Sequence, residues 1–449
     1  MRLSYIALAL VVGLLAGPFN LAQQPAAPAQ PTAQDVAALM QRITDLEDRV
    51  VSLEGQLRQM KAQGAQPAPP AVPAPQAGAT AQPPAPAPTV AAEPRLGGAG
   101  VAAAKALNPD ISMIGDFIAS AGHNPINPTP SFQMHESELG VQAIVDPYAR
   151  ADFFLSFGEE GVNLEEGFLT FTALPAGFVV KGGKMRAAFG KVNTLHNHVL
   201  PWVDRPLVTQ NLVGGEDGID DAGVSVQHII PAPKNLFVEF TGQTFRGDSA
   251  DVFHAATKND LSVVGHLRVY KDLTENSNID MGGSYSRGHN LFDTSLIGPL
   301  FGNDFITQLY GIDAIYRWKP LRRSIYRSLT ARSEFIWRQQ DQPSLAACVS
   351  ITCPPNTAPG FQRAFGFYTS ADYQFARRWF FGGRVDSSDR AFNSHLNDKG
   401  GSLVLTYWPS EFSQLRGQYR LTRYAENFDA HELFIQLQFA LGAHGAHPF

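Results

Sequence analysis

Along most of this chain, apolar side chains alternate with polar or small ones. Near the end, Leu433, Ile435, Leu437, Phe439 and Leu441 alternate with mostly small or polar residues. A two-residue period of this kind is typical of a β-strand with two different faces. The period returns in about sixteen segments. The predicted strands are 110–120, 133–145, 148–157, 164–173, 178–187, 222–230, 235–245, 261–271, 278–287, 304–318, 328–338, 363–375, 379–387, 400–408, 413–424 and 432–442.

The connections between these strands fall into two classes. Every second connection is short, whereas most of the others are long: 121–132, 188–221, 246–260, 288–303, 339–362 and 388–399. Short turns at one end and long loops at the other are the signature of an outer-membrane barrel. We therefore predict an all-β transmembrane antiparallel barrel of about sixteen strands over 110–449, with its N-terminus in the periplasm. An even strand number lets the last strand close against the first.

The final strand carries a second signal. Outer-membrane barrels end on a strand with a terminal aromatic residue, and the barrel-assembly machinery recognises this strand. Either Phe449 or Phe439 fits that position. We therefore expect outer-membrane lipid and the barrel-assembly machinery as partners.

The region before the barrel has three parts. Residues 1–22 combine Arg2 with a short apolar run and read as a secretory signal peptide. Residues 63–104 are rich in Pro, Ala, Gln and Gly, which predicts a disordered, extended linker. Residues 35–62 repeat apolar positions at spacings of three and four, which predicts a periplasmic coiled coil. The apolar positions are Val36, Leu39, Ile43, Leu46, Val50, Leu53, Leu57 and Met60.

The coiled coil indicates oligomerisation, although an amphipathic helix resting on another surface would give the same period. The branched residues at alternate seam positions favour a dimer on simple rules. The segments Arg42–Glu47 and Arg49–Glu54, RITDLE and RVVSLE, instead resemble the Arg- and Glu-flanked pattern of trimeric coiled coils. We therefore expect a homotrimer.

Composition excludes several classes of function. The formal net charge is −6 and only 17% of residues are charged, so nucleic acid is not an expected partner. The motifs HExxH, GxSxG and GxxxxGK[ST] are absent from the sequence, so neither an enzyme nor a cofactor is expected. The two cysteines, Cys348 and Cys353, are expected to form a disulfide that closes a loop, because the chain is exported and a lone pair is weak evidence for zinc.

The longest loop and its flanks carry a family resemblance. Residues 177–191 read GFVVKGGKMRAAFGK, and residues 220–226, after the loop, read DDAGVSV. This order of segments resembles the phosphate-selective porin O and P family, and the resemblance covers roughly Asp110 to Phe449. It implies a trimeric sixteen-stranded porin whose third loop, 188–221, folds inward and narrows the pore. The arginine-rich loop expected for phosphate selection is not evident, since Arg205 is its one arginine.

A charged side chain that faces lipid at mid-depth costs about 2–4 kcal/mol, so charged strand residues are expected to line the pore. Arginines can guide anions, or they can pair with acids and stiffen the wall. By strand parity, the expected pore-lining residues are Arg150, Asp152, Glu166, Lys184, Arg186, Arg268, Arg332, Glu334, Arg338, Arg384, Arg416 and Arg420.

Four residues of the third loop are candidates for the constriction. Asp204 and Arg205 either narrow the pore or brace the loop against the wall. His196 and His198 could touch one metal ion, but no third ligand is fixed by the spacing, so we expect surface histidines and no metal site. The acidic run 214–223 is expected to be an ordinary turn rather than a calcium site. The tail histidines His444 and His447 also lack partner ligands.

The leading hypothesis is a bacterial outer-membrane porin that passes small hydrophilic solutes, including anions, by passive diffusion. The alternative is a structural anchor that tethers the envelope through its coiled coil and linker. A TonB-dependent receptor would need about 22 strands and a plug domain. The absence of a nucleophile motif argues against a barrel enzyme.

Overall fold

A computed structural model describes residues 109–158, 161–233, 235–249, 251–292, 305–343, 354 and 356–442. Several sequence predictions fall outside these residues and stay predictions. They are the signal peptide 1–22, the coiled coil 35–62, the linker 63–104, the disulfide between Cys348 and Cys353, the tail histidines His444 and His447, and the terminal Phe449.

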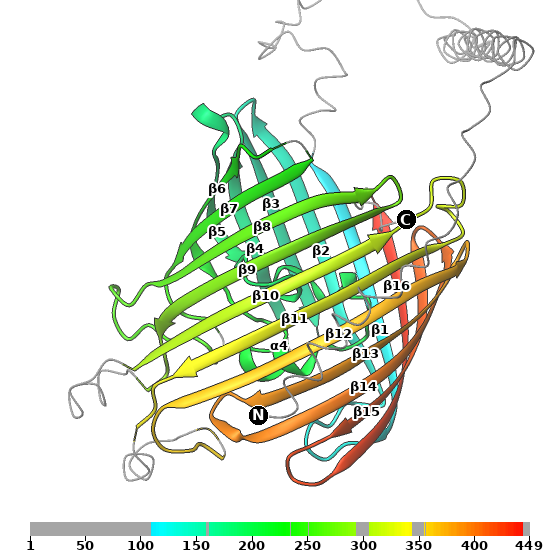
Figure 1. Ribbon diagram of the computed structural model, residues 1–449. Coiled ribbons are helices and arrows are strands. Elements are labelled where there is room, and N and C mark those ends of the chain that lie inside the picture. Colours follow the sequence, from blue (N-terminus) through cyan, green and yellow to red (C-terminus); the bar gives the residue numbers. More distant parts are fainter. Residues whose placement is uncertain are drawn as a thin grey trace, which may run out of the picture. The chain divides into compact units, whose positions relative to one another are not determined.

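Within the described residues, sixteen strands form a closed antiparallel barrel, which confirms the predicted all-β architecture (Figure 1). Each strand pairs with its sequence neighbours, and β1 pairs with β16 in a register that places Gly115 opposite Phe439. Closure leaves no free sheet edge. The strands are β1 (Asp110–His123), β2 (Phe132–Asp146), β3 (Ala149–Gly158), β4 (Gly161–Phe171), β5 (Val179–Arg186), β6 (Asp220–Ile230), β7 (Leu236–Phe245), β8 (Ser262–Thr274), β9 (Ser277–His289), β10 (Ile306–Trp318), β11 (Ser328–Gln340), β12 (Gln362–Ala376), β13 (Trp379–Arg390), β14 (Asn393–Ser410), β15 (Ser413–Arg423) and β16 (Asp429–Gly442).

The two faces of the barrel differ in the way the alternation predicts. On β16, Leu433, Ile435 and Leu437 are 46–49% exposed, whereas Gln436 and Gln438 are buried. Because the sheet is closed, the exposed apolar row faces outward and the polar row faces the lumen. An apolar exterior around a polar interior matches the requirement of a barrel in lipid.

One predicted connection is wrong. The segment 388–399 was expected to be a long loop, but β13 and β14 continue through it and are joined by a tight turn at 391–392. Asp389 pairs with Asn397 in this extension, and Arg390 lies 2.9 Å from Asp398 and 2.6 Å from Glu426. Cross-strand polar pairs hold the hairpin together without an apolar face, so the two-residue hydrophobic period gives no signal there.

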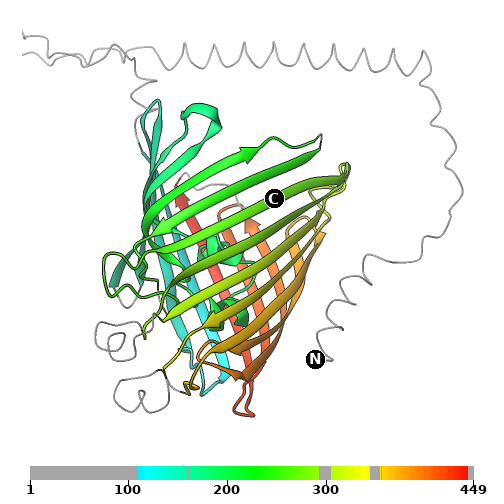
Figure 2. The same cartoon turned by 60° about the vertical axis from the view of Figure 1, so that its left-hand side comes forward.

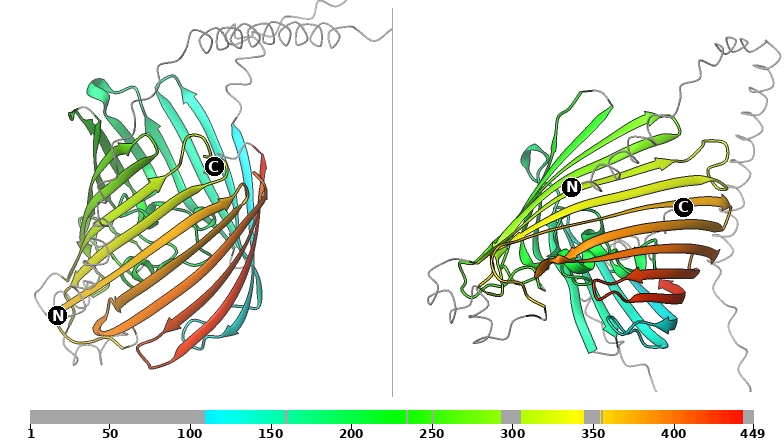
Figure 3. Two further views of the ribbon diagram at one scale, coloured as in Figure 1. Left: turned by 45° about the vertical axis from the view of Figure 1, so that its right-hand side comes forward. Right: turned by 60° about the horizontal axis from the view of Figure 1, so that its bottom comes forward.

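The connection between β5 and β6 folds into the barrel, and we call residues 187–219 the inserted loop. It contains the short helices η2 (Val192–Thr194), η3 (Asn197–Val199) and α4 (Leu207–Leu212). Figure 1 labels α4 within the ring of strands, and Figures 2 and 3 show these short helices surrounded by strands from other directions. A further short helix, η1 (Pro175–Gly177), lies in the connection before β5. No helix of the described residues is both long enough and apolar enough to cross a membrane.

The inserted loop has its own apolar core. Phe189, Leu200, Trp202, Val208 and Leu212 are almost fully buried. They pack with inward-facing residues of the wall, and the ring of Trp202 meets the ring of Tyr368 edge-on at 5.2 Å. The loop therefore packs against the wall as a folded element of the lumen.

Candidate functional site: the inserted loop and its attachments

The two ends of the inserted loop are tied together at its base. The backbone N–H of Ala187 donates to the carbonyl of Ile219 at 2.8 Å. The Asn193 amide donates to the carbonyls of Ala187 and Ile219 and accepts from the Ile219 N–H at 2.8 Å. Gly218 lies beside it with φ of +63°, where a Cβ would stand 2.1 Å from Asn193 Oδ1. Glycine is favoured here by the backbone angle, and the close Asn193 oxygen leaves no space for a Cβ atom.

Arg205, a candidate for the constriction, organises the loop itself. Its guanidinium donates to Asn197 Oδ1 at 2.9 Å and to the carbonyls of Val192 and Leu195 at 3.0 and 2.7 Å. The side chain is buried, and this burial lowers the pKa of Arg205 to about 10. Arg205 therefore fixes the fold of residues 192–197.

Asp204 attaches the loop to the wall on the side of β13–β16. Its carboxylate accepts from Arg384 at 2.8 Å and from Arg420 at 3.0 Å, and it also accepts from the amide of Gln418. Burial alone raises the pKa of Asp204, but the two guanidinium groups outweigh it and hold the pKa well below its usual range. Of the two roles expected for Asp204, the contacts fit bracing.

Three predicted arginines of this wall are covered by the loop. Arg384 also pairs with Asp386, and Arg420 with Glu432. Arg416 donates to the carbonyl of Trp202 at 3.1 Å. All three side chains are buried, and none is more than 7% exposed. They face inward as strand parity predicted, but their donors are used by the protein.

A second attachment lies on β9–β11. Glu334 accepts from the backbone N–H groups of Lys191 and Val192, the latter at 2.9 Å. The Lys191 ammonium lies 3.4 Å from Asp280 and 3.8 Å from Asp313. Arg338 donates to the loop carbonyl of Leu212 at 3.1 Å.

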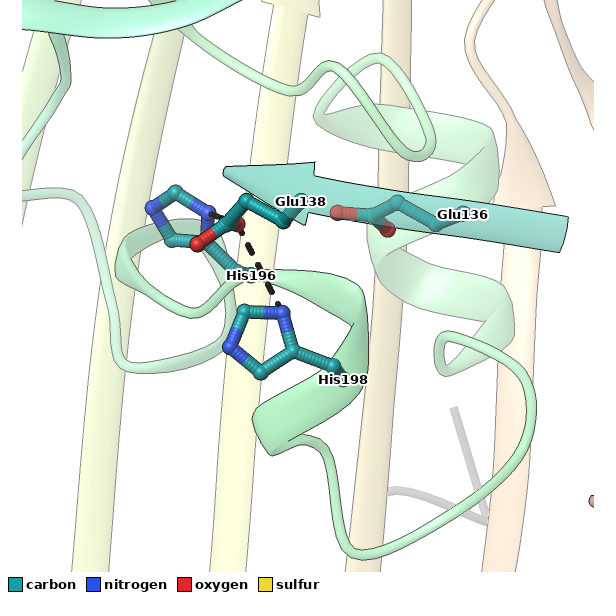
Figure 4. Close-up of side chains that lie close together, drawn as sticks. All are labelled: Glu136, Glu138, His196 and His198. Carbon is teal, nitrogen blue, oxygen red and sulfur yellow. Dashed lines mark hydrogen bonds and ion pairs between the residues drawn. The ribbon is translucent and has the colours of Figure 1, made fainter. Parts of the chain in front are cut away.

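The third attachment joins the loop to β2 and β4, where acidic side chains gather. His196 Nδ1 lies 2.6 Å from Glu138 and 3.0 Å from Glu165, and its Nε2 lies 2.8 Å from Glu166. His198 Nδ1 lies 3.5 Å from Glu138 (Figure 4). Both histidines are buried, so the expectation of surface histidines is wrong. The loop turns inward and buries them against strands distant in sequence.

The remaining predicted pore-lining residues also have partners, most of them within the wall. Arg150 lies 2.5 Å from Asp152, Lys184 lies 2.9 Å from Asp220, and Arg268 lies 2.8 Å from Asp280. Arg332 pairs with Asp372, and Arg186 lies 3.4 Å from Glu165 and donates to two loop carbonyls. The alternative that acids and bases pair and stiffen the wall thus describes these contacts.

Three acidic residues of the site are not among those predicted from the sequence. Glu136 and Glu138 occupy alternate positions of β2, so strand parity could have assigned them to the lumen. Glu165 could not have been found in this way. The register between β3 and β4 shifts at this point, so Glu165 is an extra, bulged residue, and Glu165 and Glu166 both reach His196.

No known protein-family profile matches this sequence. An uncharacterised protein of Aquifex aeolicus (strain VF5) is 28% identical over 355 residues, which span 73% of this chain and 72% of that protein. The expected membership in the phosphate-selective porin O and P family therefore stays a prediction.

Several solved barrels are similar in fold at 9% sequence identity. The outer-membrane channel DcaP of Acinetobacter baumannii has a TM-score of 0.47, with 74% of this chain and 96% of that chain covered. OmpF of Salmonella typhi, solved with daunomycin, has a TM-score of 0.48, with 75% and 99% covered. OprB of Pseudomonas putida has a TM-score of 0.46, with 76% and 95% covered. Similarity at this level does not assign a function, so we infer function from the residues of this chain.

Proposed function

We propose that this chain is a porin of the bacterial outer membrane that lets small hydrophilic solutes diffuse through its barrel. The observation that supports this most is the contrast between an exposed apolar exterior and a polar, charged interior in a closed barrel. A barrel serving only as an anchor in lipid would need the apolar exterior, but it would not need a charged lumen.

The inserted loop is proposed to narrow the pore. Its attachments support this role, because it is bound to β2 and β4 on one side and to β13 and β15 on the other. A segment held at several points of the wall reduces the open cross-section and keeps a fixed position. We propose that solutes pass beside it.

Selectivity is proposed to arise from lumen charges that the loop leaves accessible. The side chains of Arg150, Arg268 and Arg317 are 35–50% exposed. The positive charges of these side chains favour the passage of small anions. The carboxylates paired with Arg150 and Arg268 weaken that preference, so we expect a modest anion preference.

The assembly proposed here is a homotrimer in outer-membrane lipid, with residues 35–62 as a periplasmic coiled coil after removal of residues 1–22. The sequence patterns of these segments support it. The strand β16, which closes the barrel, is proposed to be the element that the barrel-assembly machinery recognises.

Channel recording tests the proposed function. The full-length protein, purified in detergent, is added to a planar bilayer, and single-channel conductance and reversal potential are measured in a salt gradient. We expect discrete conductance steps and a reversal potential shifted modestly toward anions. A protein that inserts into the bilayer without conducting would contradict the porin and favour the envelope tether.

A further inference from the structure

We propose that Glu136, Glu138, His196 and His198 form a binding site for a divalent transition-metal ion such as Zn²⁺. One carboxylate oxygen or imidazole nitrogen from each residue can be chosen so that all four atoms lie within 4.8 Å of one another. We call these four residues the β2–loop cluster. This inference concerns the attachment of the loop and does not depend on solute transport.

Secondary structure places the four side chains on two facing surfaces. Glu136 and Glu138 are two residues apart on β2, so both project from the same face of the strand. His196 and His198 lie at the start of η3 in the inserted loop. Figure 4 shows the carboxylate of Glu136 directed along β2 toward Glu138, with both imidazoles beside Glu138.

The environment of Glu136 is the second observation that indicates a cation site. Its side chain belongs to a residue that is only 5% exposed, and neither carboxylate oxygen accepts a hydrogen bond from an N–H or hydroxyl group of the described residues. Burial penalises the charge on this carboxyl group, and the neighbouring carboxyl group of Glu165 is placed to share a proton with it, while Glu138 adds a further like charge and His135 an opposite one. A buried carboxyl group must share a proton or have an opposite charge or a metal ion beside it, and a cation bound here would replace the shared proton.

The surroundings also orient one imidazole for metal binding. Glu166 lies 2.8 Å from Nε2 of His196, which leaves Nδ1 directed at Glu138, 2.6 Å away, with Glu165 at 3.0 Å from the same nitrogen. A histidine that binds a metal through one ring nitrogen usually donates the N–H of its other ring nitrogen to a carboxylate. This hydrogen bond fixes both the tautomer and the ring orientation. A metal ion would take the place of the proton that His196 and Glu138 share in the metal-free protein.

The donor set selects the class of ion. Two imidazole nitrogens with two carboxylates suit Zn²⁺ and neighbouring divalent transition metals, whereas Ca²⁺ and Mg²⁺ prefer oxygen ligands alone. Metal–ligand bonds of about 2.0–2.2 Å require the four ligand atoms to lie closer to one another than they do in this structure. Because two ligands come from β2 and two from the loop, the bound ion would cross-link the loop to the wall.

The test is a metal-binding measurement on the full chain in detergent. All proteins carry His444→Ala and His447→Ala, so that the tail histidines cannot contribute. After incubation with Zn²⁺ and desalting, bound metal is counted by mass spectrometry, and Co²⁺ is added separately to record its visible absorption. We expect one Zn²⁺ per chain, a Co²⁺ spectrum of a low-coordinate site, and no retained Ca²⁺.

Two variants and one control localise the site. Glu136→Gln and His198→Ala are each expected to lower Zn²⁺ affinity at least tenfold, whereas His395→Ala, which changes an exposed histidine, should leave it unchanged. Heat-dependent mobility on gels checks that each variant folds. Should a variant not fold, the Co²⁺ spectrum of the parent protein decides, since a spectrum of hydrated Co²⁺ overturns the proposal. Absence of retained Zn²⁺ in the parent, or equal affinity in folded variants, overturns it as well.

Discussion

Asp204 of the inserted loop lies 2.8 Å from Arg384 of β13, and the same carboxylate accepts a hydrogen bond from Arg420 of β15. One acidic side chain thus joins the loop to two strands that it precedes by 180 and 216 residues. The pairing gives the loop a fixed position on this side of the lumen.

Replacing Asp204 by Asn should therefore detach this side of the loop. Removing one partner of a buried ion pair leaves uncompensated charge, and we expect the free energy of unfolding to fall by about 3 kcal/mol. Urea unfolding in lipid vesicles measures the change. Asp429→Asn is the matched control, because Asp429 pairs with Arg423 at an exposed site and should cost no more than about 0.5 kcal/mol. Equal costs for the two variants would contradict the attachment.

The attachment through Asp204 should also make the free energy of unfolding depend on pH. The pKa of Asp204 is held below its usual range, so its contribution to stability is fully present above the ordinary aspartate pKa of about 3.9 and is lost as the pH falls further. The difference in unfolding free energy between the natural protein and Asp204→Asn should stay constant from pH 7 to about pH 5 and shrink below about pH 4. Unfolding curves at several pH values check this, and a difference that disappears near neutral pH would refute it.

The base of the loop offers a test by double mutation. Asn193→Ala should cost about 1–3 kcal/mol, because it leaves buried backbone groups unsatisfied. Gly218→Ala should also destabilise, but less when Asn193 is already Ala, since the new Cβ then meets no side-chain oxygen.

Hydrogen exchange of residues 187–219 and urea unfolding measure this coupling. Gly215→Ala is the control, because Gly215 has a similar positive φ with no atom within 4 Å of the added Cβ. Gly215→Ala should lower the free energy of unfolding only by the cost of the strained backbone angle, and this cost should be the same with or without Asn193→Ala. Additive effects of Asn193→Ala and Gly218→Ala would show that the two residues are not in contact.

Ion preference should depend on exposure rather than on the number of arginines. The side chain of Arg317 is 42% exposed and is loosely paired with Asp280 at 4.0 Å, whereas Arg416 is buried against the carbonyl of Trp202. Arg317→Gln should shift the reversal potential toward cations, and Arg416→Gln should leave it nearly unchanged while lowering stability. The opposite order in salt-gradient recordings would show that the loop does not cover Arg416 during conduction.

The barrel could be predicted from sequence because its signal is local. Each strand repeats one apolar face every second residue, as β16 does, and a turn follows within the same short segment. The prediction failed where that signal stops, in the polar hairpin around Arg390, because cross-strand pairs with Asp398 rather than an apolar face hold the strands there.

The loop attachments could not be predicted in the same way. Asp204, His196 and Arg205 are candidates that the loop sequence itself provides, but their partners are determined by closure of the barrel. Glu138 precedes His196 by 58 residues and Arg420 follows Asp204 by 216, so spacing carries no information about either contact. The bulge that places Glu165 beside Glu166 has no sequence signature of its own.

The inserted loop packs with residues from opposite ends of the strand order, including Ile118 of β1 and Phe434 of β16 around Val203. These partners come together only after the first and last strands have met. The cluster around Val203 therefore forms late in assembly, after β1 and β16 have paired, because contacts so distant in sequence require that closure first. An open sheet therefore holds this part of the loop less firmly than the finished barrel does.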